Sequence, residues 1–167
     1  MTLKQRTLHL VGALTAQALF ACSGGDSSPT APGTPVMQLT QADLQVGGES
    51  VAGQTLGPGH GQGQHTFFMA ELMLDGAPAP GHEVWVKFDR PGGMMGMNQG
   101  QFRLYDDGTH GDPTPGDGVY CLLDTESRYG CHGANMRDGE YHYDFWGQHQ
   151  AGHESNHEHV RVWVDQN

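Results

Sequence analysis

The chain has 167 residues, including 26 glycines, and its 19 acidic and 8 basic side chains give a formal charge of −11 at neutral pH. A protein with this negative charge repels the phosphate backbone of nucleic acids. Its sequence also has no cluster of basic residues interleaved with aromatic residues, which is typical of proteins that bind nucleic acids. We therefore predict that nucleic acid is not a partner, whereas divalent cations are natural counter-charges.

The first 21 residues are typical of a secretory signal peptide. Lys4 and Arg6 precede an apolar segment, residues 8–20, which is too short to span a bilayer. Residues 19–22, Leu-Phe-Ala-Cys, resemble the lipobox of bacterial lipoproteins. We expect cleavage before Cys22 and lipidation of its thiol and amine, which anchors the protein to a membrane, with the outer membrane favoured. Plain secretion with Cys22 as a free thiol is the alternative.

Residues 22–35 are expected to form a flexible tether. Glycine, serine and proline dominate this segment, and Ala31 is its one apolar residue beyond Cys22. Removal of the signal peptide leaves six basic and 19 acidic side chains, and hence a formal charge of −13. The tether is long enough to hold a folded domain away from a membrane surface.

Residues 36–167 predict a single all-β domain, an antiparallel β-sandwich. Short apolar runs alternate with glycine-rich turns, and period-two alternation such as Val84, Val86 and Phe88 predicts one buried face for each strand. The expected strands are residues 36–39, 49–52, 66–74, 83–88, 100–104, 119–124, 140–146 and 159–164.

A methionine-rich stretch lies between the strands expected at 83–88 and 100–104. Met94, Met95 and Met97 supply thioethers on a glycine-rich loop, and soft sulfur ligands suit Cu(I). The alternative is a loop whose methionines pack against the sandwich.

The segment 105–120 places four aspartates among four glycines between two expected strands. Asp106, Asp107, Asp112 and Asp117 offer oxygen, the ligand that Ca²⁺ prefers, and glycine lets the backbone fold tightly around an ion. The spacing differs from that of the EF-hand and lacks its closing glutamate. A calcium loop and a hydrogen-bonded Asp/Gly turn are therefore both open interpretations.

Residues 104–120, which read LYDDGTHGDPTPGDGVY, resemble the hallmark of bacterial surface Ig-like domains known as choice-of-anchor X. Similar features stand at 84–88, 139–145 and 159–164, so the resemblance covers approximately residues 65–165. It implies an extracytoplasmic Ig-like β-sandwich and says little about ligand or activity. Pro113 and Pro115 depart from the small residues usual at these positions.

Two cysteines remain once Cys22 carries the lipid. In an oxidising compartment Cys121 and Cys131 most simply form one disulfide, which would pin residues 122–130 and contribute roughly 2.5–3 kcal/mol. A redox role is the weaker alternative, because the pair lacks the Cys-x-x-Cys spacing.

Parity along the strands predicts an exposed aromatic face. Trp85, Trp146, Trp163 and His142 all have the outward parity, and such a face binds glycans, proteins or hydrophobic surfaces unless another segment covers it. If the last two strands pair around residues 148–157, one register gives favourable neighbours. It matches Trp146 with His159, Asp144 with Arg161 and His142 with Trp163.

Residues 153–157, His-Glu-Ser-Asn-His, match the zinc-peptidase motif H-E-x-x-H. That motif requires a helix, whereas a strand pattern follows here, so we interpret it as a chance match. A looser hypothesis is that His149, His153, His157 and His159 bind a transition metal such as copper or zinc in a flexible loop. Solvated loop histidines are the alternative.

No nucleophile and base are arranged in a recognisable catalytic motif, so the sequence does not predict an enzyme. We predict a lipid-anchored binding or structural module of the cell envelope, stabilised by calcium at the aspartate loop. The alternative is an envelope protein that handles copper or zinc through its methionine-rich and histidine-rich loops.

Overall fold

The computed structural model of the chain describes residues 34–92, 99–132 and 136–167. These residues form an all-β sandwich, which confirms the predicted fold class, and no helix among them is long and apolar enough to cross a bilayer. Residues 34–167 make one compact unit. The predicted signal peptide, Cys22, Met94, Met95 and Met97 lie outside the described residues.

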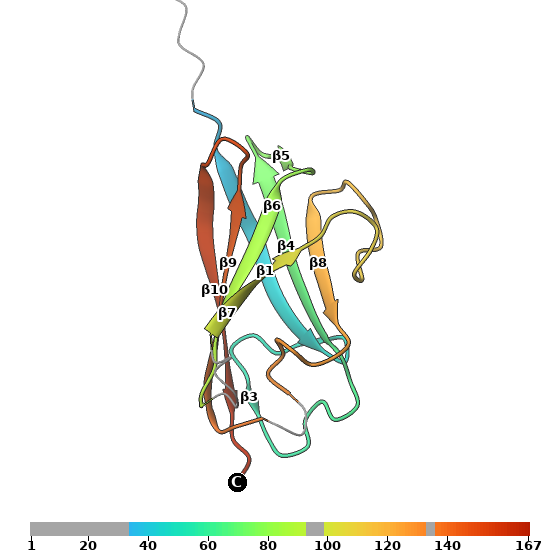
Figure 1. Cartoon of the computed structure of the whole chain (residues 1–167), viewed down its shortest axis with the longest axis vertical. Helices are drawn as coiled ribbons and strands as arrows, with labels where there is room; N and C mark the ends of the chain where they lie inside the picture. Colours follow the sequence, from blue (N-terminus) through green and yellow to red (C-terminus); the bar gives the residue numbers. More distant parts are fainter. Residues whose placement is uncertain (1–33, 93–98, 133–135) are drawn as a thin grey trace, which may run out of the picture. The chain divides into compact units, whose positions relative to one another are not determined.

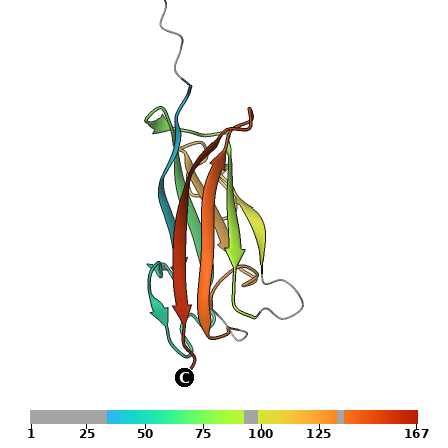
Figure 2. The same cartoon turned by 90° about the vertical axis from the view of Figure 1, so that its left-hand side faces the viewer.

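Two sheets build the sandwich (Figure 1). The first sheet has the order β2-β1-β4-β5, with β8 also paired to β4. Its strands are β1 (Met37–Val46), β2 (Glu49–Ser50), β4 (Thr66–Leu74), β5 (Ala77–Pro78) and β8 (Val119–Asp124). The second sheet has the order β3-β10-β9-β6-β7 and is antiparallel apart from the parallel pair of β3 and β10. Its strands are β3 (Thr55–Leu56), β6 (Glu83–Asp89), β7 (Gln99–Leu104), β9 (Gly139–Gln148) and β10 (Glu154–Val164). Figure 2 views the second sheet, with β10 in dark red beside β9 in orange.

Alternating side chains from both sheets form the core between them. Phe68 of β4 lies at its centre, with ring-centroid distances of 4.8 Å to Phe102 of β7 and 5.5 Å to Tyr143 of β9. All three rings are buried. Burial of each such ring stabilises the fold by about 1.5–3 kcal/mol, so the period-two pattern fixes which face of each strand turns inward.

The register predicted for the last hairpin is wrong by two residues. In the structure Trp146 pairs with His157, Asp144 with His159 and His142 with Arg161, while Trp163 lies opposite Glu140. The cause is the connection, because a tight turn at residues 149–153 replaces the long loop that we expected. The strand β10 therefore begins at Glu154, and a bulge between Glu154 and His157 resets the pairing.

Asn156, in that bulge, connects the two sheets. Its side-chain amide accepts a hydrogen bond from the Leu39 N–H (2.7 Å) and donates one to the Leu39 carbonyl (3.1 Å). A bulge in β1 between Leu39 and Gln41 lies at the same place. The two bulges therefore join the edges of the sandwich through one side chain.

The predicted disulfide is absent, because Cys121 and Cys131 are both free and buried. Cys121 pairs with Met69 in the middle of β4, whereas Gly130, next to Cys131, packs against Thr66. Met69 and Thr66 are three residues apart on β4, which separates them by about 10 Å, whereas the two Cα atoms of a disulfide lie within about 7 Å of each other. Cys131 also belongs to the core cluster between the sheets, and Cys121 does not. Burial raises the pKa of both thiols to about 12.

Candidate functional site

The outer face of the second sheet carries a row of side chains that crosses four neighbouring strands. His157 of β10 pairs with Trp146 of β9, Trp146 pairs with Trp85 of β6, and Trp85 pairs with Arg103 of β7. We call these four residues the Trp row. The rings of Trp146 and His157 stack with an interplanar angle of 7° and a centroid distance of 5.5 Å. Both tryptophans are half-buried, so ring surface remains open to solvent.

Glu83 holds one end of the Trp row in place. Its carboxylate accepts a hydrogen bond from Trp85 Nε1 (3.3 Å) and another from the Arg103 guanidinium (3.1 Å). The same guanidinium lies 5.7 Å from the ring centroid of Tyr105, within the range of a cation–π contact. The aromatic and cationic groups at this end are therefore oriented before any ligand arrives.

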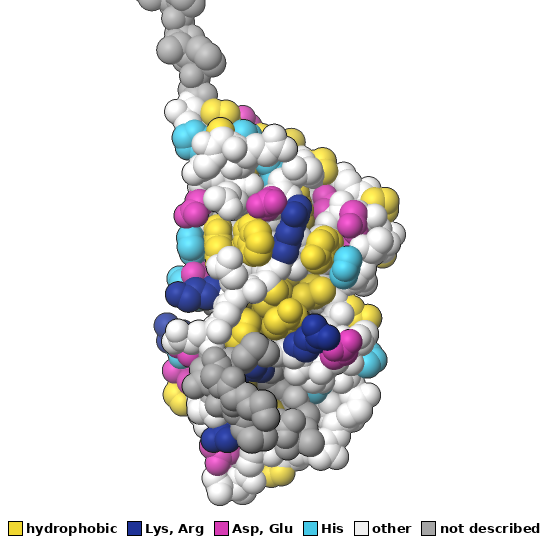
Figure 3. All heavy atoms as spheres, viewed as in Figure 1, with side chains coloured by type: hydrophobic (Ala, Val, Ile, Leu, Met, Phe, Trp, Pro, Cys, Tyr) yellow, Lys and Arg dark blue, Asp and Glu magenta, His cyan; other side chains and the backbone are white. Residues whose placement is uncertain are grey.

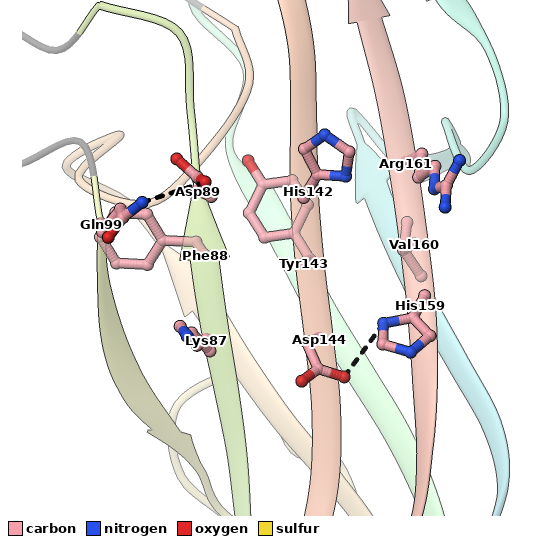
Figure 4. A pocket seen from close by; sticks show the side chains of 10 residues that line it. All are labelled: Lys87, Phe88, Asp89, Gln99, His142, Tyr143, Asp144, His159, Val160 and Arg161. Carbon is pink, nitrogen blue, oxygen red and sulfur yellow. Dashed lines mark hydrogen bonds and ion pairs between the residues drawn. The ribbon is translucent and has the colours of Figure 1, made fainter.

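Two residues further along β6 and β9, the facing pair Lys87 and Asp144 is charged. Asp144 of β9 lies between two imidazoles, with 2.9 Å to Nδ1 of His157 and 3.1 Å to Nδ1 of His159. Together with Lys87 it lines a depression of about 260 Å³ on the sheet surface. Figure 4 shows the side chains of this depression, which come from β6, β7, β9 and β10. It offers a carboxylate, an ammonium group and imidazoles beside the tryptophans.

On its other side the Trp row runs into a groove. Trp85, Arg103 and Tyr105 line this groove. The rings of Phe102 and Tyr129, which also line it, stack with a centroid distance of 4.3 Å. Its volume is about 640 Å³, and it lies between β7 and β8, where neighbouring edges of the two sheets separate. Figure 3 shows hydrophobic side chains gathered with Lys and Arg side chains over these strands. The row and the groove thus make one continuous aromatic and polar surface.

The residues predicted for the aromatic face are spread along the second sheet. Trp85 and Trp146 are direct neighbours, and His142 lies on the same side of β9. Trp163 pairs with Glu140, six residues from Trp146 along β9, a separation of about 20 Å. It is 49% exposed. Trp163 is therefore a separate aromatic group on this face.

The four histidines proposed to share a metal do not form one group. His157 and His159 contact Asp144, whereas the His149 ring lies tilted beside the His82 ring, with a centroid distance of 5.0 Å. His153 lies in the turn that precedes β10. The H-E-x-x-H motif thus runs from a turn into strand β10 and does not lie on a helix.

Hydrogen bonds to the backbone organise the aspartate loop. The Asp106 carboxylate accepts hydrogen bonds from the backbone N–H groups of Gly116 (2.6 Å), Asp117 (3.2 Å) and Gly118 (3.1 Å). Asp112, which is buried, accepts the N–H groups of Gly108 and Thr114. These bonds are those of an Asp/Gly turn.

The same loop brings three carboxylates close enough for a cation. Oxygen atoms of Asp106, Asp112 and Asp117 lie within 4.8 Å of one another, and oxygens that share a Ca²⁺ ion are at most about 5 Å apart. Asp107 is not part of this group. It is exposed and bonds Thr109, whose hydroxyl lowers the pKa of the Asp107 carboxyl. Calcium binding stays a prediction, with three of the four expected ligands in place.

Sequence reasoning missed Glu83, Arg103 and Asp144 as members of the site. Each has outward parity on a strand that was predicted. The sequence of a single strand shows only that the residue is polar and faces outward, and does not show which residues of the neighbouring strands lie beside it. Their importance arises only from the pairing of β6 with β7 and β9.

No protein-family model matches the chain, and no curated protein matches it. The similarity to choice-of-anchor X domains therefore stays an interpretation of the motif at residues 104–120.

Proposed function

We propose that the domain is a carbohydrate-binding module of the cell envelope that holds a glycan chain along the Trp row. The observation that carries the proposal is the alignment of His157, Trp146, Trp85 and Arg103 across four adjacent strands. Sugar rings have C–H faces that pack on aromatic rings, and their hydroxyls bond to planar polar groups. The Trp row and Glu83 supply both kinds of group side by side.

The shape of the surface favours an extended glycan over other ligands. A small-molecule site is a concave pocket that encloses most of its ligand, whereas the Trp row lies on an outer sheet face. A protein interface has a core depleted of charged residues, whereas Glu83, Arg103 and Asp144 all adjoin the tryptophans. The groove beside Arg103 gives a long ligand further contacts with aromatic rings.

The proposed location is the cell envelope, where lipid attached at Cys22 would hold the module on a membrane. Residues 23–35 would then act as a spacer between the membrane and the binding face. Glycans are abundant outside the cytoplasm, so a module tethered there meets its ligand without transport. The proposal assigns no catalytic residue.

The test is a binding screen with the full chain carrying Cys22→Ser, against insoluble and soluble polysaccharides that differ in linkage and charge. At least one glycan should be retained, and the double variant Trp85→Ala/Trp146→Ala should bind it at least about tenfold more weakly. Trp163→Ala is the matched control, because it removes an exposed tryptophan about 20 Å from the Trp row and should leave binding unchanged. Equal retention of the parent and the double variant would refute the proposal.

A further inference from the structure

A second row of side chains runs beside the Trp row on the outer face of the second sheet. His159 of β10 pairs with Asp144 of β9, Asp144 pairs with Lys87 of β6, and Lys87 pairs with Gln101 of β7. We call these four residues the polar row. Each of them stands two residues from the member of the Trp row on the same strand, so the two rows lie about 7 Å apart. A sugar ring on the Trp row therefore has the polar row at its side.

Asp144 does not form an ion pair with Lys87, although the two residues face each other across β6 and β9. One oxygen of its carboxylate lies 2.9 Å from Nδ1 of His157, and the other lies 3.1 Å from Nδ1 of His159. Figure 4 shows the second of these contacts, with Lys87 beside it. Among the residues that the structure describes, the Lys87 ammonium group has no hydrogen bond and no ion pair. The two imidazoles thus engage the carboxylate that an ordinary cross-strand ion pair would give to Lys87.

Gln101 lies on the other side of Lys87 and is a second donor without a partner. Its side-chain amide forms no hydrogen bond with any residue in the described part of the chain, and both side chains are exposed. Directly opposed side chains of an antiparallel pair have Cβ atoms about 5 Å apart, so the ammonium and amide groups can reach one acceptor. Ionised oxygen atoms accept such hydrogen bonds more strongly than neutral hydroxyls do. The pair is therefore suited to an anionic group.

The few basic side chains of this acidic protein gather around the Trp row. The chain has six of them after residue 35, and four line the depression and the groove beside the row: Lys87, Arg161, Arg103 and Arg128. Each of the three arginines forms an ion pair with a glutamate. Lys87 is the member of this group that has none among the described residues. At physiological salt the repulsion from distant acidic residues is screened beyond about 8 Å, so the nearby ammonium group determines what charge binds here.

We propose that the glycan held on the Trp row is acidic, and that Lys87 and Gln101 bind its carboxylate or sulfate group. This inference rests on the proposed function, and it names the chemical class of the ligand. Acidic substituents project from the side of a sugar ring, and the polar row lies to the side of Trp85. The long, flexible stem of Lys87 lets its ammonium group follow the substituent. Neutral glycans leave the ammonium group without a partner and bind more weakly.

The test extends the binding screen to matched polysaccharides, again with the full chain carrying Cys22→Ser. Alginate and polygalacturonate carry carboxylates, and dextran sulfate carries sulfates. Methyl-esterified polygalacturonate and dextran are the neutral counterparts. We expect at least one acidic polysaccharide to bind about tenfold or more tightly than the neutral ones, and Lys87→Gln to remove most of this preference. Because the Lys87 side chain is exposed and makes no contact listed above, the variant should keep the melting temperature of the parent. A preference for alginate or polygalacturonate identifies a carboxylate, and a preference for dextran sulfate alone identifies a sulfate.

Arg137→Gln is the matched control. It removes the same charge from an exposed residue that precedes β9, at the end of that strand far from Trp146, and it should bind like the parent. The inference is overturned, while the proposed function stands, if the glycans bound through Trp85 and Trp146 are neutral. It is also overturned if Lys87→Gln binds the acidic glycan as tightly as the parent does. If no polysaccharide of any charge is retained, the proposed function fails and this inference fails with it.

Discussion

Asp106 shows how much a single side chain organises in this chain. Its carboxylate bonds three backbone N–H groups of the aspartate loop, whereas the adjacent Asp107 bonds only Thr109 at the surface. In the sequence analysis both residues belong to one ligand set, because a motif does not distinguish adjacent aspartates. Which carboxylate turns inward depends on the backbone path between Tyr105 and Val119, and that path is set by tertiary contacts.

The first prediction compares Asp106→Asn with Asp107→Asn. An asparagine at 106 turns an NH₂ group toward backbone N–H donors, so we expect a loss of about 1–3 kcal/mol in the free energy of unfolding. Asp107→Asn is the matched control and should change stability by less than about 0.5 kcal/mol. Urea denaturation measures both, and equal effects would contradict the assignment. If calcium binds, millimolar Ca²⁺ should raise the melting temperature of the Asp107 variant but not of the Asp106 variant.

The second prediction concerns acid and His82. Burial, and then repulsion by His149, lowers the pKa of His82 below its ordinary value of 6.5. The unfolded chain takes up a proton near pH 6.5, while the folded chain resists it. His82 therefore contributes stability that is present above about pH 6.5 and is lost as the pH falls through its lower folded pKa.

Urea denaturation of the parent and of His82→Gln at about pH 7.5 and pH 5 checks this sign. The parent should lose more stability on acidification than the variant does, since the two proteins differ only at residue 82. A larger loss in the variant would show that the shift has the opposite direction.

Long strands were predictable from the sequence, and the shortest strands were not. The bounds of β4 and β8 agree with the expected 66–74 and 119–124, although neither sequence alternates clearly and the apolar run at 66–74 also fits a helical stripe. The short strands β3 and β5 have two residues each and show no period, so they were not predicted. β1 extends to Val46 instead of Leu39, because it continues through the bulge after Leu39.

The outer face of the second sheet was predictable from parity, but its neighbours were not. Trp85 and Trp146 have the same parity on strands that were expected, so their common face follows from the sequence. The stacking of His157 on Trp146 depends on the turn at 149–153 and on the bulge at Asn156, neither of which has a periodic signal. A register shift of two residues between β9 and β10 leaves each side chain on the same face of the sheet but changes its cross-strand neighbour.

The third prediction tests the connection at the bulge. Asn156→Ala removes the two hydrogen bonds to the Leu39 backbone that join β10 to β1, and the free energy of unfolding should fall by about 1–3 kcal/mol. His153→Ala, in the preceding turn, is the control and should have little effect. A denaturation midpoint equal to that of the parent would show that the bulges do not depend on this amide.

For the whole molecule, charge and attachment belong together. Removal of the predicted signal peptide would leave a formal charge of −13, which would repel anionic surfaces, so we propose that lipid at Cys22 is the feature that would keep the chain on a membrane. Cys121 and Cys131 were expected to pair because two cysteines in an oxidising compartment most simply form one disulfide. That argument does not reveal that Cys131 belongs to the core cluster between the sheets and Cys121 does not.

The fourth prediction is that Cys22→Ser releases the protein from the membrane fraction and abolishes lipid labelling. The melting temperature of the domain should not change, because residue 22 lies outside the compact unit 34–167. Cell fractionation and metabolic labelling with a fatty acid measure both effects. Ser23→Ala is the control and should remain attached, and continued membrane association of Cys22→Ser would contradict the proposed anchor.

The most direct test of the binding proposal follows the three tryptophan indole N–H signals in a ¹H–¹⁵N NMR spectrum, as a short oligosaccharide of the glycan found in the screen is added. The signals of Trp85 and Trp146 should shift together and saturate, because both rings lie in the Trp row. The signal of Trp163, about 20 Å away along β9 and β10, should stay in place. Shifts at Trp163 with none at Trp85 and Trp146 would contradict the account.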